Sequence, residues 1–333
     1  MGSGMSLAIC GTLTSLPGFL VGQASDFKNL TGCTVILCPP GTLGSIDIRG
    51  SAAGTRQIDA LLSYHIVNEV QAILLAGGSA FGLDAAGGVM EFLEERGQGF
   101  DVTITRVPTV PAAVIFDLSL GNCRVRPDKA MGYAACVQAD ASPVAEGSIG
   151  VGTGATVGKL FGLQQGMKGG LGSVCLRGPD GLLVAALVVV NAFGDVRDYV
   201  TGRIIAGARL APDSQSFVDT AAHIRRGIVR RQFGEPNTTL GVVATNARLT
   251  REQAQKIAQM GHNGLAKAIT PIHTLFDGDI VFVLAQPEIP ADLHVVGLLA
   301  EEALRLAVDR AIKRAHGLGV LPAYEDLHHR ENA

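Results

Sequence analysis

The sequence predicts one domain of mixed α/β layers. Apolar stretches typical of strands alternate along the chain with amphipathic stretches typical of helices. Hydrophobic residues make up 47% of the 333 residues and 43 are glycines, a composition that suits closely packed sheets and helices. No Gly/Ser-rich or charged linker divides the chain, which is long enough to bury a core without disulfide or metal cross-links. We therefore treat residues 1–333 as a single domain.

In the first half, short apolar runs predict buried strands over residues 34–37, 72–75 and 113–118. Residues 55–70 are predicted to form a helix, because their apolar side chains recur with helical spacing on one face. A second helix is predicted over residues 84–95, after the glycine-rich AGGSAFG loop.

In the second half, residues 182–190 are apolar on both faces, which predicts a central strand. Further strands are predicted over residues 240–244 and 279–284. Thr250 and Gln253 form a capping box for a helix reaching about residue 260. Residues 291–316 predict a long amphipathic helix. The most loop-like stretch is the basic segment 224–237, which runs into a strand beginning near Thr238.

Charge and cysteine usage exclude several functional classes. The 27 basic and 30 acidic side chains leave a net charge of −3, so there is no basic surplus for nucleic acid. The six cysteines form no C-x-x-C pair and are expected to be small buried hydrophobes in a reducing compartment. The amino terminus has no signal-peptide pattern, and the longest apolar run is too short for a membrane span. The sequence thus predicts a cytoplasmic protein without a nucleic-acid or membrane partner.

Two glycine-rich motifs fail the nucleotide and nucleophile-elbow tests. In GVGTGATVGKL, Thr153 stands where a P-loop needs glycine, and Leu160 replaces the hydroxyl that binds Mg²⁺. A tight turn is one interpretation; a loop that directs Lys159 into a site is the other. In AGGSAFG, Phe81 stands where G-x-S-x-G needs its second glycine. This loop could be structural or line a pocket.

Metal signals are weak. Asp277-Gly-Asp279 could form half of a carboxylate metal site, but no third carboxylate recurs at a suitable spacing and there is no H-E-x-x-H. No metal and no cofactor are predicted.

The triplet Asn237-Thr238-Thr239 has three interpretations. It could be a glycosylation sequon, which has no meaning in a cytosolic protein, or an ordinary turn before a strand. It could also be a self-cleaving junction, where the Thr238 hydroxyl attacks the preceding carbonyl and the product begins with a threonine whose own amine serves as base. Spacing alone does not decide between them.

Nine collinear segments resemble one family, the amino-terminal-nucleophile hydrolases of the D-aminopeptidase/β-aminopeptidase type, including S58-type peptidases and 6-aminohexanoate-oligomer (nylon) hydrolases. These segments are VGQASD, GCTVIL, RGSAAGTRQIDAL, LLAGGSAFGLDAA, RPD, GTGATVGK, VVVNAFGD, NTTLGVVATNA and DGDIVF. The resemblance implies a four-layer α/β/β/α sandwich. It also implies self-cleavage between Asn237 and Thr238 into chains 1–237 and 238–333, which stay intertwined.

The resemblance also implies roles for individual residues. Thr238 would be the nucleophile, with its freed amine, of ordinary pKa about 7.7–8.0, as the base. Asp277 and Asp279 would orient its hydroxyl and ammonium. Asn191 would donate to the oxyanion, and Lys159 would neutralise the aspartates or support the oxyanion. Without the resemblance, a strand-capping Asn191 and a surface Lys159 are the simpler interpretations.

One position departs from the pattern. Some relatives carry an aromatic hydroxyl where this chain has Phe116, so we expect Phe116 to wall the substrate pocket instead. The resemblance implies hydrolysis of small peptides, amino-acid amides or ω-amino-acid oligomers, and a homotetramer. An ornithine-acetyltransferase-type acyltransferase and a non-catalytic ligand-binding relative are the alternatives.

Overall fold

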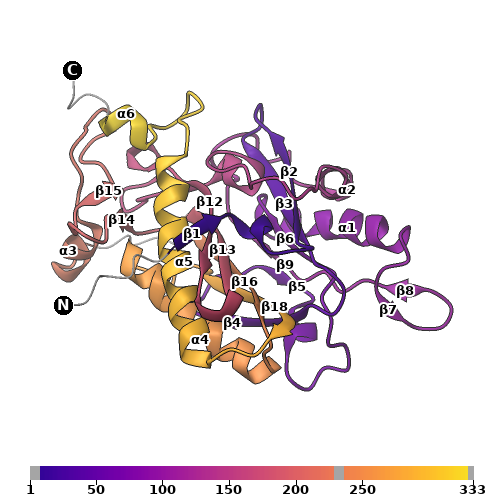
Figure 1. Cartoon of the computed structure of the whole chain (residues 1–333). Helices are drawn as coiled ribbons and strands as arrows, with labels where there is room; N and C mark the ends of the chain where they lie inside the picture. The colour runs from indigo at the N-terminus through magenta and orange to yellow at the C-terminus, as the bar shows by residue number, and fades with distance from the viewer. Residues whose placement is uncertain (1–7, 229–235, 329–333) are drawn as a thin grey trace, which may run out of the picture.

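The computed structural model describes residues 8–228 and 236–328. Two sheets stack face to face in its centre (Figure 1). The first sheet has the strand order β1 (Ala8–Gly11), β12 (Gly170–Arg177), β13 (Leu183–Asn191), β16 (Thr238–Ala247), β18 (Ile280–Ile289), β4 (Leu43–Ile48). The second has the order β2 (Leu20–Asp26), β3 (Thr31–Leu37), β6 (Ala72–Ala76), β9 (Ala112–Val114), β5 (Thr55–Arg56).

Helices cover both outer faces (Figure 1). The pair α4 (Arg251–Ala268) and α5 (Leu293–Lys313) packs on the first sheet, and the pair α1 (Ala85–Glu94) and α2 (Lys129–Val137) packs on the second. The remaining elements are short: β7 (Phe100–Asp101), β8 (Arg106–Val107), β10 (Thr156–Val157), β11 (Met167–Lys168), β14 (Asp195–Arg197), β15 (Ile204–Ala206), β17 (Ile269–Thr270), α3 (Thr220–Arg225) and α6 (Tyr324–His328). The predicted four-layer α/β/β/α sandwich is confirmed.

Burial on both faces explains the apolar character of β13. Val184 and Val188 pack into the core between the first sheet and its helices. Leu187 and Val189, on the other face, pack into the core between the two sheets. Because both faces are buried, the strand shows no alternation of apolar and polar residues.

The two long helices begin as their sequences predict. Thr250 and Gln253 form the capping box of α4, and Asp292 caps α5 by accepting from the N–H groups of His294 and Val295. Helix α4 continues beyond the predicted end near residue 260, because Leu265 and Ala268 extend its buried face.

The predicted helix over residues 55–70 is wrong. Residues Thr55–Arg56 form edge strand β5, which pairs with β9, and Ile58–Leu61 form a single 3₁₀ turn. Gln57, between them, has a left-handed backbone with φ of +54°. Leu61 and Val70 do reach the core, but Ile66 is exposed. Sheet pairing therefore outweighs the helical spacing of the apolar residues.

Two other predictions need correction. The strand predicted over residues 113–118 comprises only Ala112–Val114, because the chain then turns to bring Asp117 onto the loop before α1. Of the six cysteines, three are buried, Cys10 and Cys38 are half-buried, and Cys123 is exposed, so burial does not describe them all.

Within residues 8–228 and 236–328, no helix combines the length and apolar character that crossing a membrane requires. The same residues contain no group of three or more histidine, cysteine, aspartate or glutamate side chains that could hold a metal ion.

Candidate active site

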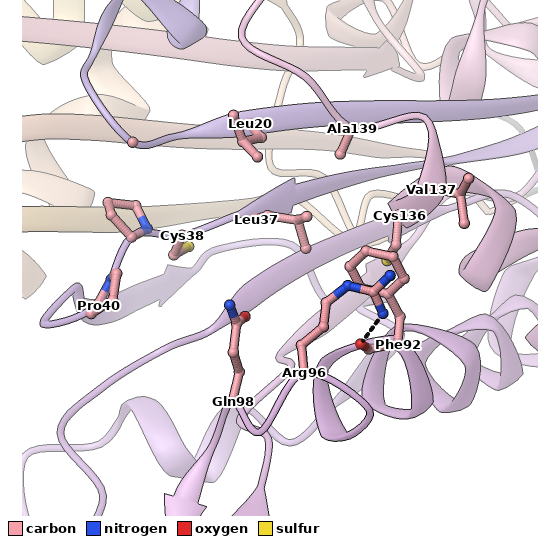
Figure 2. Close-up of a pocket in the computed structure, with 12 residues that line it drawn as sticks. Leu20, Leu37, Cys38, Pro40, Phe92, Arg96, Gln98, Cys136, Val137 and Ala139 are labelled. Carbon is pink, nitrogen blue, oxygen red and sulfur yellow. Dashed lines mark hydrogen bonds between the residues drawn. The ribbon is translucent and has the colours of Figure 1, made fainter.

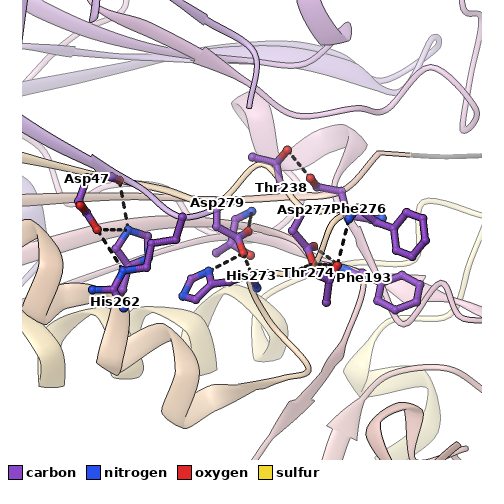
Figure 3. Close-up of polar contacts among 12 residues, drawn as sticks. Asp47, Phe193, Thr238, His262, His273, Thr274, Phe276, Asp277 and Asp279 are labelled. Atoms are coloured by element: carbon purple, nitrogen blue, oxygen red, sulfur yellow. Dashed lines mark hydrogen bonds and ion pairs between the residues drawn. The ribbon is translucent and has the colours of Figure 1, made fainter. Parts of the chain in front are cut away.

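Three of the predicted site residues, Thr238, Asp277 and Asp279, lie close together at one end of the first sheet (Figure 3). Thr238 is the first residue of β16 and lies opposite Asn191, the last residue of β13, in an antiparallel ladder. On the other side, β16 runs parallel to β18, which directly follows Asp277-Gly278-Asp279. The predicted catalytic side chains of Thr238, Asn191, Asp277 and Asp279 are buried. Lys159, which could have been a surface residue, is only 2% exposed.

The carbonyl oxygen of the peptide before Thr238 accepts two hydrogen bonds. The Thr238 hydroxyl donates to the Asn237 carbonyl oxygen at 2.5 Å. The Gly278 N–H donates to the same oxygen at 2.7 Å, and the Asn237 N–H donates to the Phe276 carbonyl at 2.8 Å. The hydroxyl is therefore held against its own upstream peptide, whose carbonyl is polarised by a backbone donor.

The two aspartates near Thr238 each accept hydrogen bonds from neighbouring segments. Asp277 Oδ1 accepts from the Phe193 N–H at 3.2 Å, and its Oδ2 accepts from the Thr274 hydroxyl at 2.5 Å. Asp279 Oδ1 accepts from the Thr239 N–H at 2.7 Å. The expectation that both carboxylates orient the Thr238 hydroxyl and ammonium stays a prediction for the cleaved protein, because here their hydrogen bonds go to these neighbours.

Asn191 and Lys159 form one polar cluster. Asn191 Oδ1 accepts from Lys159 Nζ at 2.9 Å, from the Thr156 N–H at 3.0 Å and from the Thr156 hydroxyl at 3.2 Å. Asn191 Nδ2 donates to the Phe116 carbonyl at 3.1 Å. Phe116 thus joins the site through its backbone, and the role of its half-buried ring as a pocket wall stays a prediction.

A second buried lysine, which the sequence analysis missed, holds the loop that carries Lys159. Lys168 Nζ donates to the carbonyls of Thr153 and Ala155 at 2.7 and 2.9 Å. Burial lowers the pKa of Lys168 to about 7, although Asp117 acts in the opposite direction. No motif marks Lys168; only the pairing of β10 with β11 brings it under the loop.

Asp117 accounts for glycines in both glycine-rich motifs. Its carboxylate accepts from the Gly78 N–H and the Thr31 hydroxyl, both at 2.7 Å, and burial raises its pKa. A Cβ atom at Gly77 would lie 2.1 Å from Asp117 Oδ2, and one at Gly154 would lie 2.4 Å from it. These glycines therefore allow two loops to close around one carboxylate.

The RGSAAG segment holds the Asp277–Asp279 turn through backbone hydrogen bonds. The N–H groups of Arg49 and Gly50 donate to the Asp279 carbonyl at 3.0 and 3.2 Å, and the Ala52 N–H donates to the Asp277 carbonyl at 2.9 Å. A Cβ atom at Gly50 would lie 2.2 Å from the Asp279 nitrogen. Only glycine allows this approach, which explains its place in the motif.

A separate pocket lies between the second sheet and its helices (Figure 2). It has a volume of about 470 Å³ and is mostly apolar, with Leu37, Phe92 and Cys136 in its wall. Arg96 at its rim donates to the Phe92 carbonyl at 2.8 Å. None of the predicted site residues lines this pocket.

Because Asp277 is buried, we expect the free energy of unfolding to depend on pH. Burial, and secondly the nearby Asp279, raise the pKa of Asp277 from 3.8 to about 6. Folded protein therefore holds an extra proton between pH 4 and 6, and the stability from this group is lost as the pH rises through 6.

We expect Asp277→Asn, which stays neutral, to lack that loss. Its free energy of unfolding should therefore rise relative to wild type as the pH increases from 4.5 to 7.5. Urea unfolding measures the difference, with Thr238→Ala in both proteins so that each is one chain. Parallel pH profiles would contradict the assignment.

Solved structures confirm the fold class. The β-aminopeptidase of Burkholderia sp. has a TM-score of 0.68 at 18% identity, with 98% of this chain and 95% of that one covered. The L-aminopeptidase D-Ala-esterase/amidase of Ochrobactrum anthropi, described as a variant of the Ntn hydrolase fold, has a TM-score of 0.70 at 18% identity, with 93% and 88% covered. The layered sandwich is thus that of the amino-terminal-nucleophile hydrolases.

The family follows from the sequence. The model of Peptidase family S58 matches residues 11–317. The chain belongs to this peptidase family, and it is a hydrolytic enzyme that acts on amide bonds.

Two relatives show how far the similarity extends. An uncharacterized aminopeptidase of Mycobacterium leprae is 40% identical over 320 residues, which cover 88% of this chain and 85% of the relative. A 6-aminohexanoate-oligomer endohydrolase of Kocuria sp. is 32% identical over 284 residues, covering 82% and 74%.

Proposed function

We propose that the protein is a self-processing hydrolase whose nucleophile is Thr238. The chain cuts itself between Asn237 and Thr238, and the new terminal threonine then hydrolyses small peptides, amino-acid amides or ω-amino-acid oligomers through an acyl-Thr238 intermediate. The observation that carries the proposal is the contact of the Thr238 hydroxyl with the Asn237 carbonyl, which also accepts from Gly278.

Self-cleavage follows from that contact. The hydroxyl oxygen attacks the Asn237 carbonyl carbon, and charge develops on the carbonyl oxygen, where the Gly278 N–H already donates. The C–N bond breaks as the threonine nitrogen takes up the proton, and water hydrolyses the resulting ester. Chain 238–333 then begins with a free amine beside the hydroxyl.

Turnover uses the same groups. The amine takes the hydroxyl proton as the oxygen attacks the substrate carbonyl, and later returns it to the leaving amine. The side-chain amide of Asn191 has two N–H groups. One donates to the Phe116 carbonyl, and the second can donate to the oxyanion. Lys159 places its buried amino group beside that amide, where Nζ donates to Asn191 Oδ1. Water then releases the acyl group from Thr238.

Intact-mass analysis and a substrate panel test the proposal. Purified protein should give two masses, those of chains ending at residue 237 and beginning at residue 238. A panel of p-nitroanilides with L-, D-, β- and ω-amino acyl groups should identify a turned-over substrate. One stable chain of 333 residues would contradict self-processing, and product formed only with an added amine acceptor would indicate an acyltransferase.

We further propose a cytoplasmic homotetramer. Tyr64, Ile104 and Val200 are large and highly exposed, and contacts with neighbouring copies would remove their apolar surface from water. Light scattering on the same preparation measures the number of copies.

A further inference from the structure

The Asp279 carboxylate is held from two sides (Figure 3). Its side chain is fully buried. Oδ1 accepts from the Thr239 N–H at 2.7 Å, next to the proposed nucleophile. Oδ2 accepts from the His273 backbone N–H at 3.0 Å and lies 2.8 Å from His273 Nδ1. Asp279 thus links the start of β16 to His273.

The hydrogen-bond partners of the His273 ring indicate which of its two nitrogens carries the N–H. The Asp279 carboxylate already accepts from two backbone N–H groups, so at its contact with His273 the Nδ1 atom is assigned as the donor. Nε2 is buried and has no hydrogen-bond partner within the part of the chain that the structure describes. A buried nitrogen without a proton is less costly there than an unsatisfied N–H, so we place the N–H of the ring on Nδ1.

A second histidine holds the ring of His273. His262, on α4, meets it edge to face with ring centroids 4.8 Å apart. His262 Nε2 lies 3.1 Å from the Asp47 carbonyl and 3.5 Å from the Asp47 carboxylate, which also accepts from Arg49 at 3.1 Å. Burial lowers the pKa of His262 to about 4, so it adds no charge beside His273 near neutral pH.

The backbone of His273 is specialised as well. Its φ of +57° lies in the left-handed region, which non-glycine residues seldom adopt. This conformation brings the N–H and Nδ1 of one residue to the same carboxylate oxygen.

We propose that His273 is a positioning residue for the reaction of Thr238, holding Asp279 so that this carboxylate fixes the Thr239 N–H and with it the nucleophile. The inference rests on the function proposed above. His262 and Asp47 keep the His273 ring in place. Loss of the Nδ1–H donor frees Asp279 to rotate, which displaces the start of β16. A displacement of about 1 Å in such a site can reduce the rate about 100-fold.

The test compares His273→Ala with His273→Asn. Asparagine tolerates the left-handed backbone, and its side-chain N–H can replace Nδ1–H. We expect His273→Ala to slow self-cleavage and lower kcat at least 10-fold with KM nearly unchanged, and His273→Asn to recover most of this. His294→Ala, which removes an exposed histidine paired with Asp292, is the control and should behave like wild type.

The outcomes separate this inference from the proposed function. If wild type and His273→Ala both cleave themselves and both turn over substrate at the same rate, the inference about His273 is wrong and the proposed function stands. Equal losses in both His273 variants, matched by lowered urea midpoints, also overturn it, because a purely structural role would produce them. Wild type that neither processes nor turns over any substrate overturns both.

Discussion

Thr238→Ala should leave a single uncut chain without measurable amidase activity. The substitution removes the oxygen that contacts the Asn237 carbonyl, so no ester can form and no amino-terminal base is released. Turnover should fall by roughly 10⁴-fold or more, as expected when a nucleophile is lost. Intact mass and p-nitroanilide hydrolysis measure the two effects.

Thr238→Ser is the matched control, because it keeps the hydroxyl and should still process. Thr238 is 3% exposed, so the urea midpoints of both variants must be compared with wild type to show that they fold. Two chains from the alanine variant, one ending at residue 237 and one beginning at residue 238, would show that another group cuts the chain.

Gly278→Ala has the second-largest expected effect, on self-cleavage. A Cβ atom there would lie 2.7 Å from the Ala52 carbonyl oxygen and 2.9 Å from the Thr238 hydroxyl. The Asp277–Asp279 turn must shift, and the Gly278 N–H then leaves the Asn237 carbonyl. Loss of one such donor costs about 3–4 kcal/mol, or about 10²- to 10³-fold in rate. A time course of chain cleavage by mass spectrometry measures it.

Gly87→Ala is the control for this variant. A Cβ atom at Gly87, in α1, would have the flexible side chain of Lys129 as its nearest neighbour, at 2.8 Å. It should process at the wild-type rate, since it lies on the opposite outer layer. Normal cleavage by Gly278→Ala would remove this N–H from the proposed mechanism.

The long buried strand and the long amphipathic helix were predictable from sequence, and the short edge strand was not. Strand β13 and helix α5 fall within a residue or a few residues of their predicted bounds, because burial dictates their composition. Residues 55–70 carry helically spaced apolar residues too, but β5 pairs with β9 there, and local spacing contains no record of that partner.

The same distinction applies to the site. Thr238, Asn191 and the two aspartates could be named because they resemble a family motif, and sheet pairing brings them together. His273, His262 and Lys168 carry no motif. Their contacts depend on how α4, β4 and the short β10–β11 pair pack against the site, which spacing along the chain does not encode.

The position of β16 and β18 in the first sheet has a consequence for maturation. These adjacent strands are flanked by β13 on one edge and β4 on the other, and both flanking strands precede residue 237. A break before Thr238 would leave the short polypeptide wedged between two parts of the long one, so it could escape only by opening both ladders together. Once unfolded, the two pieces would have to find each other again, and recovery would depend on their concentration. Cleavage would therefore make unfolding harder to reverse, while the assembled state would persist because both ladders must open for it to be lost.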